Sequence, residues 1–148
     1  MPFSSTRCQF TEGSVALPEG YLDRTVNVFA PAAADSASFN IARDTLPPDE
    51  TLSAYIDRQL SLLGKHLKGW KERSRAPAQL GQGEQALNGE CVQASYLRDG
   101  QRVWQQQAVF APGNGLILVF TQSVGRALTE QDKAQFADLL NSFTRAAS

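Results

Sequence analysis

Short turn signals divide the second half of the chain into segments of strand length. Asn88-Gly89 and Asp99-Gly100 readily accept the positive φ angles of type I′ hairpin turns, and residues 112–115 (PGNG) mark a third reversal. The strand-like segments around these turns are residues 84–87, 90–97, 101–111 and 116–124. Strands joined by such short turns must run antiparallel. The sequence therefore predicts a four-stranded meander, with the apolar segment 116–124 in the centre of its sheet.

The N-terminal third also has the pattern of strands. Residues 15–17 precede a Pro-Glu-Gly turn at 18–20, and residues 23–30 alternate in the manner of a half-buried strand. An Ala/Ser/Asp-rich loop at 31–38 leads into another strand at 39–43. We expect the last two strands to form an antiparallel hairpin.

A first helix is predicted after Pro47 and Pro48, which block an earlier start. Asp49 and Glu50 place negative charge at the positive end of the helix dipole, and Gly64 and Gly69 weaken the far end. Apolar residues recur at helical spacing: Leu52, Tyr55, Ile56, Leu60, Leu62, Leu63 and Leu67.

A second helix is predicted at the C-terminal end, with Thr129 as its cap and Asp132 at the third helical position. Its buried stripe consists of Phe136, Leu139, Leu140 and Phe143. With a weaker strand at 70–74, the order ββ-α-β-meander-α predicts an α+β fold. We expect one domain over residues 1–148, with a mostly antiparallel sheet made of an N-terminal hairpin and a C-terminal meander, and two main α-helices.

Composition argues against several classes of partner. The 14 basic and 15 acidic residues are dispersed, so no basic stripe is available to neutralise a nucleic-acid backbone. The longest apolar run, residues 116–120, is too short to span a bilayer, and the N-terminus lacks a signal-peptide pattern. We therefore expect a cytoplasmic protein without nucleic-acid partners or direct membrane insertion. In that compartment, Cys8 and Cys91 are expected to be free thiols.

Catalytic patterns are weak. His66 is the one histidine, so a His-based metal cluster cannot form, and its place on the apolar arc of the first helix favours a packed structural role. Residues 81–86 match G-x-G-x-x-A, but Pro77 precedes them in place of a strand and no helix follows. We expect no enzyme, no metal and no cofactor. A small enzyme that pairs His66 with a carboxylate stays open as an alternative.

Two glutamine-containing surfaces suggest binding. The apolar arc of the first helix spans about 160°, wider than one packing face needs, and it includes Gln59. In strand 101–111, Trp104, Ala108 and Phe110 share one face and are predicted core. The other face is uncharged and carries Val103, Gln105, Gln107 and Val109. Both a solvated sheet face and a ligand-binding surface are compatible with this pattern.

Several segments resemble the DcrB-related family. They are residues 17–29 (LPEGYLDRTVNVF), 42–50 (ARDTLPPDE), 55–60 (YIDRQL) and 102–107 (RVWQQQ). Within that family the chain is most similar to the Eag chaperones of bacterial type VI secretion, and the similarity covers nearly the whole chain. The family's lipoprotein branch fits less well, because no signal sequence or lipid-attachment cysteine is expected near the start.

The resemblance implies a PsbP-like fold and a homodimer with a concave, apolar groove. It implies a type VI effector chaperone that shields the N-terminal transmembrane helices of a PAAR-containing toxin before loading onto the secretion spike. The expected protein-binding surface is Val26, Val28, Ile41, Gln59, Leu63, Leu67, Gln105 and Gln107. A PsbP-like assembly subunit of a soluble complex is the alternative binding function.

Overall fold

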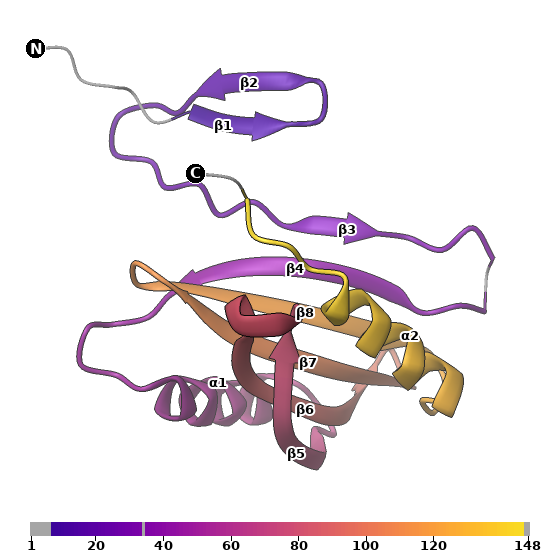
Figure 1. Cartoon of the computed structure of the whole chain (residues 1–148). Helices are drawn as coiled ribbons and strands as arrows, with labels where there is room; N and C mark the ends of the chain where they lie inside the picture. Colours follow the sequence, from indigo (N-terminus) through magenta and orange to yellow (C-terminus); the bar gives the residue numbers. More distant parts are fainter. Residues whose placement is uncertain (1–6, 34, 147–148) are drawn as a thin grey trace, which may run out of the picture.

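The computed structural model describes residues 7–33 and 35–146, which form two sheets and two α-helices (Figure 1). The strands are β1 (Arg7–Phe10), β2 (Gly13–Ala16), β3 (Asn27–Phe29), β4 (Ser38–Thr45), β5 (Lys71–Leu80), β6 (Leu87–Arg98), β7 (Gln101–Gly113) and β8 (Leu116–Val124). The helices are α1 (Leu52–His66), the 3-10 turn η1 (Gly83–Gln85) and α2 (Glu130–Asn141). This mostly antiparallel arrangement confirms the predicted α+β class.

The main sheet has six strands in the order β3-β4-β8-β7-β6-β5, every neighbouring pair antiparallel. Asp99 and Gly100 have φ angles of 52° and 81° between β6 and β7, as a type I′ turn requires. Asn114 and Gly115, at 58° and 72°, reverse the chain between β7 and β8. These two predicted hairpins are confirmed, and β8 lies inside the sheet as expected.

The turn predicted at Asn88-Gly89 is wrong, because both residues lie inside β6 and pair with β5. The chain reverses earlier, through η1, so of the expected strand 84–87 only Leu87 belongs to a strand, as the first residue of β6. A Cβ added at Gly89 would lie 2.0 Å from the carbonyl oxygen of Val109. The lack of a side chain at Gly89 therefore lets β6 and β7 approach closely, which is one reason for a glycine within a sheet.

The N-terminal region is less regular than the sequence pattern predicts. β3 covers three residues of the expected strand 23–30 and pairs with β4 in the predicted antiparallel hairpin. β1, which was not predicted, pairs with β2 in a sheet of their own. Figure 1 shows this small hairpin standing off the main sheet, beyond β3.

Both helix starts are capped by side chains. Thr51 Oγ1 accepts a hydrogen bond from the Ala54 amide at the start of α1. Thr129 and Asp132 exchange side-chain and backbone hydrogen bonds at α2, which confirms the predicted capping arrangement. Within the described residues, neither helix is long and apolar enough to cross a membrane.

The two helices cover different faces of the main sheet. α2 packs on a core of Leu80, Ala108, Phe110, Phe120, Phe136 and Leu140. α1 packs on the other face, over a smaller core of Tyr55, Ile56, Val92, Val109 and Ile117. The predicted core positions Ala108 and Phe110 are confirmed, each with an exposure of 0%. Because α1 covers only part of its face, the sheet beside it stays open.

Candidate protein-binding groove

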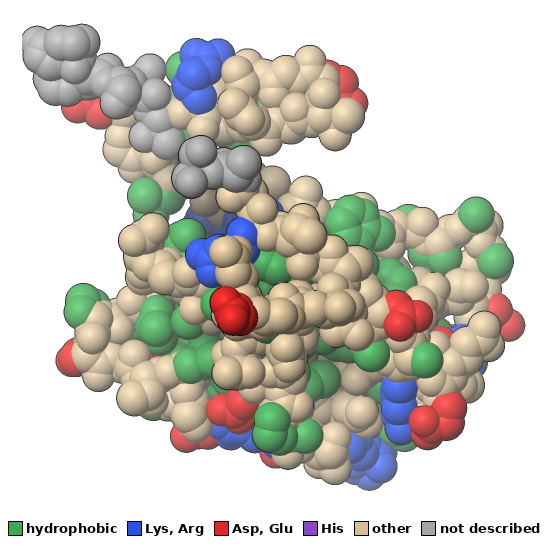
Figure 2. Space-filling view, in the orientation of Figure 1, with side chains coloured by type: hydrophobic (Ala, Val, Ile, Leu, Met, Phe, Trp, Pro, Cys, Tyr) green, Lys and Arg blue, Asp and Glu red, His purple; other side chains and the backbone are tan. Residues whose placement is uncertain are grey.

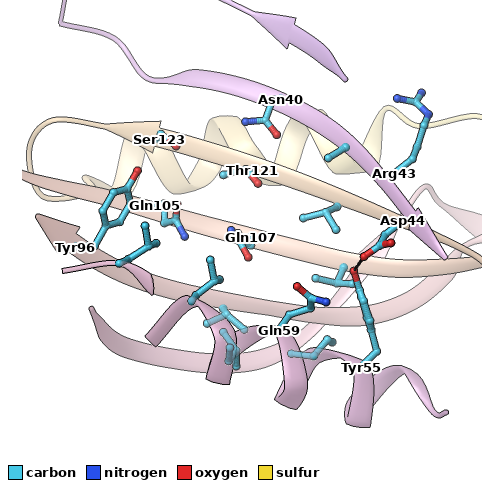
Figure 3. A pocket seen from close by; sticks show the side chains of 18 of the residues that line it. Asn40, Arg43, Asp44, Tyr55, Gln59, Tyr96, Gln105, Gln107, Thr121 and Ser123 are labelled. Atoms are coloured by element: carbon cyan, nitrogen blue, oxygen red, sulfur yellow. Dashed lines mark hydrogen bonds between the residues drawn. The ribbon is translucent and has the colours of Figure 1, made fainter. Parts of the chain in front are cut away.

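A groove with a volume of about 490 Å³ lies between α1 and the open part of this sheet face (Figure 3). α1 contributes Tyr55, Ile56, Gln59, Leu60 and Leu63 to its lining, and the C-cap residue Leu67 follows them. The sheet contributes Asn40, Ala42, Arg43, Asp44, Val92, Tyr96, Arg98, Gln105, Gln107, Val109, Val119, Thr121 and Ser123, and Arg24 lines the groove from the segment before β3. We call this surface the groove.

The helical wall of the groove follows from the 3.6-residue period of α1. Tyr55 and Ile56 are each 2% exposed and anchor the helix to the sheet. One and two turns later, Gln59 and Leu63 project from the same side of the helix. Leu63 and Leu67 belong to neither core cluster and are only partly buried. The C-terminal half of α1 therefore presents apolar surface to the groove.

The floor of the groove is a set of uncharged polar side chains in register across three strands. Asn40 of β4 lies opposite Thr121 of β8, and Thr121 lies opposite Gln107 of β7. In the next row, Ser123 of β8 lies opposite Gln105 of β7. Side chains opposite one another share a sheet face, so these rows form one continuous surface.

Glutamines on the two faces of β7 differ in their hydrogen bonding. Gln106, on the α2 face, donates to Gln122 Oε1 at 2.8 Å, and Gln122 donates to the carbonyl oxygen of Asp132 at 2.9 Å. Gln105 and Gln107, on the groove face, have no side-chain hydrogen bond to the described residues.

Gln59, Asn40 and Thr121 likewise have no side-chain partner among the described residues. No side-chain nitrogen or oxygen in that part of the chain is both fully buried and unpartnered. The amide groups on the groove face therefore keep access to the open groove. Figure 3 shows Gln59 pointing from α1 toward the strands that carry Gln105 and Gln107. The groove thus offers donors and acceptors beside apolar side chains.

Charged groups lie at the ends of the groove. At one end Asp44 accepts hydrogen bonds from Tyr55 Oη at 2.6 Å and from Arg24 at 3.2 Å. Burial opposes ionisation of Asp44, but these bonds and that from the Thr45 amide outweigh it and keep its pKa below the ordinary value. At the other end, Arg98 donates to Tyr96 Oη at 2.8 Å. Arg43, next to Asp44 in β4, also lines the groove and donates to the carbonyl oxygen of Thr25 at 2.9 Å and to Asn27 Oδ1 at 2.7 Å. The glutamines that line the groove are uncharged.

The structure brings together Gln59, Leu63, Leu67, Gln105 and Gln107, which all line the groove. The other three residues of the expected surface lie elsewhere.

Ile41 was misplaced by the sequence analysis. It packs against the α2-side core, because it lies opposite Phe120 of β8, which belongs to that core. Val28 lies opposite Asn40 and so shares the groove face, but β3 is an edge strand and Val28 is 67% exposed. Val26 precedes β3 and is also exposed.

Sequence reasoning missed several groove residues: Asn40, Asp44, Tyr96, Thr121 and Ser123. Alternation within 116–124 places residues 119, 121 and 123 on one face, so the signal for two of them was present. Because both faces of that segment also carry apolar residues, the alternation did not show which face was polar. The side of the sheet that α1 covers was not encoded in any local pattern.

The expectation that His66 is packed in the protein is wrong. His66 lies in the last turn of α1 and is exposed. In residues 7–33 and 35–146, no three His, Cys, Asp or Glu side chains are grouped so that they could hold a metal ion. The arrangement in the groove is one of contact and hydrogen bonding, with Asp44 as the single carboxylate in its lining.

Comparison with a solved structure supports the fold. The chain matches PA94 from Pseudomonas aeruginosa, a protein of unknown function, with a TM-score of 0.74 and 20% identity, over 97% of this chain and 99% of that one. It also matches LpqN from Mycobacterium tuberculosis, which is involved in cell envelope biogenesis, with a TM-score of 0.44 and 14% identity over 93% and 86% of the two chains. No curated protein matches the chain.

A family model extends across nearly all of the described elements. The model for DcrB matches residues 12–142, from the start of β2 to the end of α2 and including every strand and helix that lines the groove. The chain therefore belongs to the DcrB family.

Proposed function

We propose that this protein is a chaperone-adaptor that binds transmembrane helices of a secreted protein in the groove between α1 and the sheet. The observation that carries the proposal is the contrast between the two faces of β7. Gln106 is satisfied within the fold, whereas Gln105 and Gln107 present amides without partners beside apolar side chains. Polar groups on a partly buried surface are stabilised when a ligand completes their hydrogen bonds.

A transmembrane helix matches this surface in its chemistry. Leu60, Leu63 and Leu67 offer dispersion contacts to the apolar side chains of such a helix. A charged side chain in their place would lose its hydration against the helix and weaken binding. Transmembrane helices also carry Ser, Thr, Asn and Gln, which hydrogen-bond to neighbouring helices within the bilayer. Gln59, Gln105 and Gln107 can supply equivalent partners outside the membrane.

The size of the groove indicates how the cargo lies. A helix with its side chains is about 10–12 Å across, so a volume of about 490 Å³ accommodates one face of a helix and not the whole of it. The opposite face of the bound helix needs other cover. A second copy of the chain would supply it, and this supports the expected homodimer.

The N-terminal arm, residues 7–30, gives a second reason to expect a dimer. Tyr21 and Leu22 are 68% and 79% exposed, and Phe10 and Val15 are about half exposed. The hairpin of β1 and β2 pairs with no other strand and projects from the body (Figure 2). An isolated two-stranded hairpin is marginally stable in water. We propose that the arm packs on a second copy.

The resemblance to the Eag chaperones supports a particular cargo. It suggests the N-terminal transmembrane segment of a PAAR-containing type VI effector, held before loading onto the spike. The groove carries no histidine or cysteine in its lining. We therefore propose binding, and not catalysis, as the activity.

Substitution of Leu63 by Asp tests the groove directly. Leu63→Asp places a carboxylate against the bound helix, and its desolvation costs several kcal/mol. We expect the variant to lose co-purification of the toxin's N-terminal segment. Gln59→Leu removes hydrogen bonds with a net value of about 1 kcal/mol each and should weaken binding less.

Leu62 provides the matched control. It is 40% exposed, adjacent in the helix, and absent from the groove lining. Leu62→Asp should leave cargo binding intact, and thermal unfolding of each variant alone should show that the fold is retained. A folded Leu63→Asp variant that still retains the cargo would exclude the helical wall as the binding surface.

Light scattering tests the dimer separately. We expect a mass of about 32 kDa, twice the 16.1 kDa of the chain. Tyr21→Asp combined with Leu22→Asp should shift the protein toward the monomer, because charge on the exposed apolar arm opposes burial. A monomer of the unmodified protein at micromolar concentration would contradict the proposal.

A further inference from the structure

A second hollow, with a volume of about 140 Å³, lies on the α2 side of the main sheet. Its lining combines positive and apolar side chains: Arg73, Trp104, Leu128 and Lys133. Trp104 alternates in β7 with the groove residue Gln105, so the hollow and the groove open on different faces. We call it the basic hollow.

Arg73 is directed into the basic hollow by an irregularity in β5. The pairing of β5 with β6 shifts between Glu72 and Ser74, which leaves Arg73 without an opposite residue. A bulge of this kind redirects a side chain and recurs next to functional sites. The guanidinium of Arg73 lies over the Trp104 ring, 4.6 Å from its centroid.

A second arginine converges on the same point. Arg102, which lies beside the lining of the hollow, donates to Ser95 Oγ at 2.9 Å and to the carbonyl oxygen of Gly69 at 3.1 Å, and Arg73 donates to the same Ser95 oxygen at 3.3 Å. Ser95 is fully buried. One neutral hydroxyl therefore accepts from two guanidinium groups, and like charges that share one acceptor repel each other.

No carboxylate forms a salt bridge with Arg73 or Arg102 among the described residues. Arg75, two residues along the same strand, contacts both Asp57 and Glu90 at 2.5 Å. The chain thus neutralises one arginine of β5 with two carboxylates and leaves its neighbour beside another positive charge. An anion between Arg73 and Arg102 would relieve the repulsion and use the remaining donors.

The available donors favour a carboxylate over a phosphate. Phosphate sites commonly use free backbone amides at a helix N-terminus. The start of α2 is already capped by Thr129 and Asp132, and Arg126 neutralises Asp132. Guanidinium groups remain, and they match the planar carboxylate well. Trp104 and Leu128 add an apolar wall beside them.

We propose that the basic hollow binds an acidic side chain of a partner protein segment, with a neighbouring apolar residue against Trp104 and Leu128. The site is independent of the groove, since the two lie on opposite faces of the sheet. Both can be occupied at once.

Tryptophan fluorescence provides the test. The chain has two tryptophans, so Trp70→Phe leaves Trp104 as the single reporter. A capped Leu-Glu-Leu peptide should change its emission saturably, and a capped Leu-Gln-Leu peptide should bind roughly tenfold or more weakly. Arg73→Gln should weaken Leu-Glu-Leu binding to a similar degree. Arg73 is exposed, so this substitution should leave the fold intact.

Arg145→Gln is the matched control. Arg145 is an exposed arginine that donates to the carbonyl oxygen of Pro112, at the far end of β7. Its loss should leave peptide binding unchanged. Equal responses to the two peptides, or no effect of Arg73→Gln, would overturn the proposal. Tighter binding of inorganic phosphate than of Leu-Glu-Leu would overturn the assignment to a carboxylate.

Discussion

The Tyr55 hydroxyl donates a hydrogen bond of 2.6 Å to Oδ2 of Asp44, joining α1 to the end of β4. Tyr55 is 2% exposed, so its ring is fixed in the core beneath α1 while its hydroxyl reaches the rim of the groove. The bond closes one end of the groove and sets the distance between helix and sheet there (Figure 3).

Removal of the Tyr55 hydroxyl should destabilise the end of the groove where α1 meets β4. We expect Tyr55→Phe to lower the free energy of unfolding by about 1–2 kcal/mol, because Asp44 loses a donor that its partly buried carboxylate requires. The pKa of Asp44 should rise toward its ordinary value. Urea denaturation and an NMR titration of the Asp44 carboxyl carbon measure the two effects. An unchanged Asp44 pKa would show that the bond does not stabilise the carboxylate.

The Asp132 carboxylate should make stability depend on pH. Hydrogen bonds from Arg126 lower the pKa of the Asp132 carboxyl, and burial raises it. With the further hydrogen bonds from Thr129, the net effect is a fall in the pKa from 3.8 to about 2. Because folding lowers this pKa, the stabilisation is complete above the unfolded value and is lost as the pH falls from about 4 to about 2. Asp132→Asn should therefore be less stable than the unmodified protein at pH 7. The difference should shrink steadily as the pH falls from about 4 toward 2, as urea denaturation at each pH can measure.

Gly89 should tolerate no side chain. Gly89→Ala brings a Cβ against the Val109 carbonyl oxygen, and overpacking of this kind costs about 1–3 kcal/mol or more. Gly64→Ala is the matched comparison, because a Cβ there meets only Trp70 Cδ1 at an ordinary 3.5 Å. Within α1 that change should stabilise the protein by about 0.5–1 kcal/mol. Thermal unfolding that ranks the two variants the other way would contradict the role assigned to Gly89.

The two free thiols should differ in reactivity. Burial raises the pKa of Cys91 to about 11, so little thiolate is present at pH 8. Cys8 lies in β1 and is partly buried like Cys91, but it is outside the core of the main sheet. We expect iodoacetamide to modify Cys8 first and Cys91 only after unfolding. Peptide mass spectrometry at successive times gives the order, and equal rates in the folded protein would refute it.

Local patterns determined much of this fold. The turns at Asp99-Gly100 and 112–115 follow from backbone angles that few residue pairs accept, and the caps at Thr51 and Thr129 bind amides only three residues away. Such features depend on neighbours in sequence. The uncharged face of β7 was also visible in its alternation, which is why Gln105 and Gln107 were identified together.

Tertiary structure decided what these patterns left open. Asn88-Gly89 has the composition of a turn, yet the β5–β6 register places it within a strand against Val109. The pairing of β4 with β8 places Ile41 opposite Phe120 on the α2 face and Asn40 opposite Thr121 in the groove, and a shift of one residue would reverse every side chain of β4. The face that α1 covers depends on packing between segments distant in sequence. For that reason the helix and strand glutamines could be found from the sequence, but the groove that joins them could not.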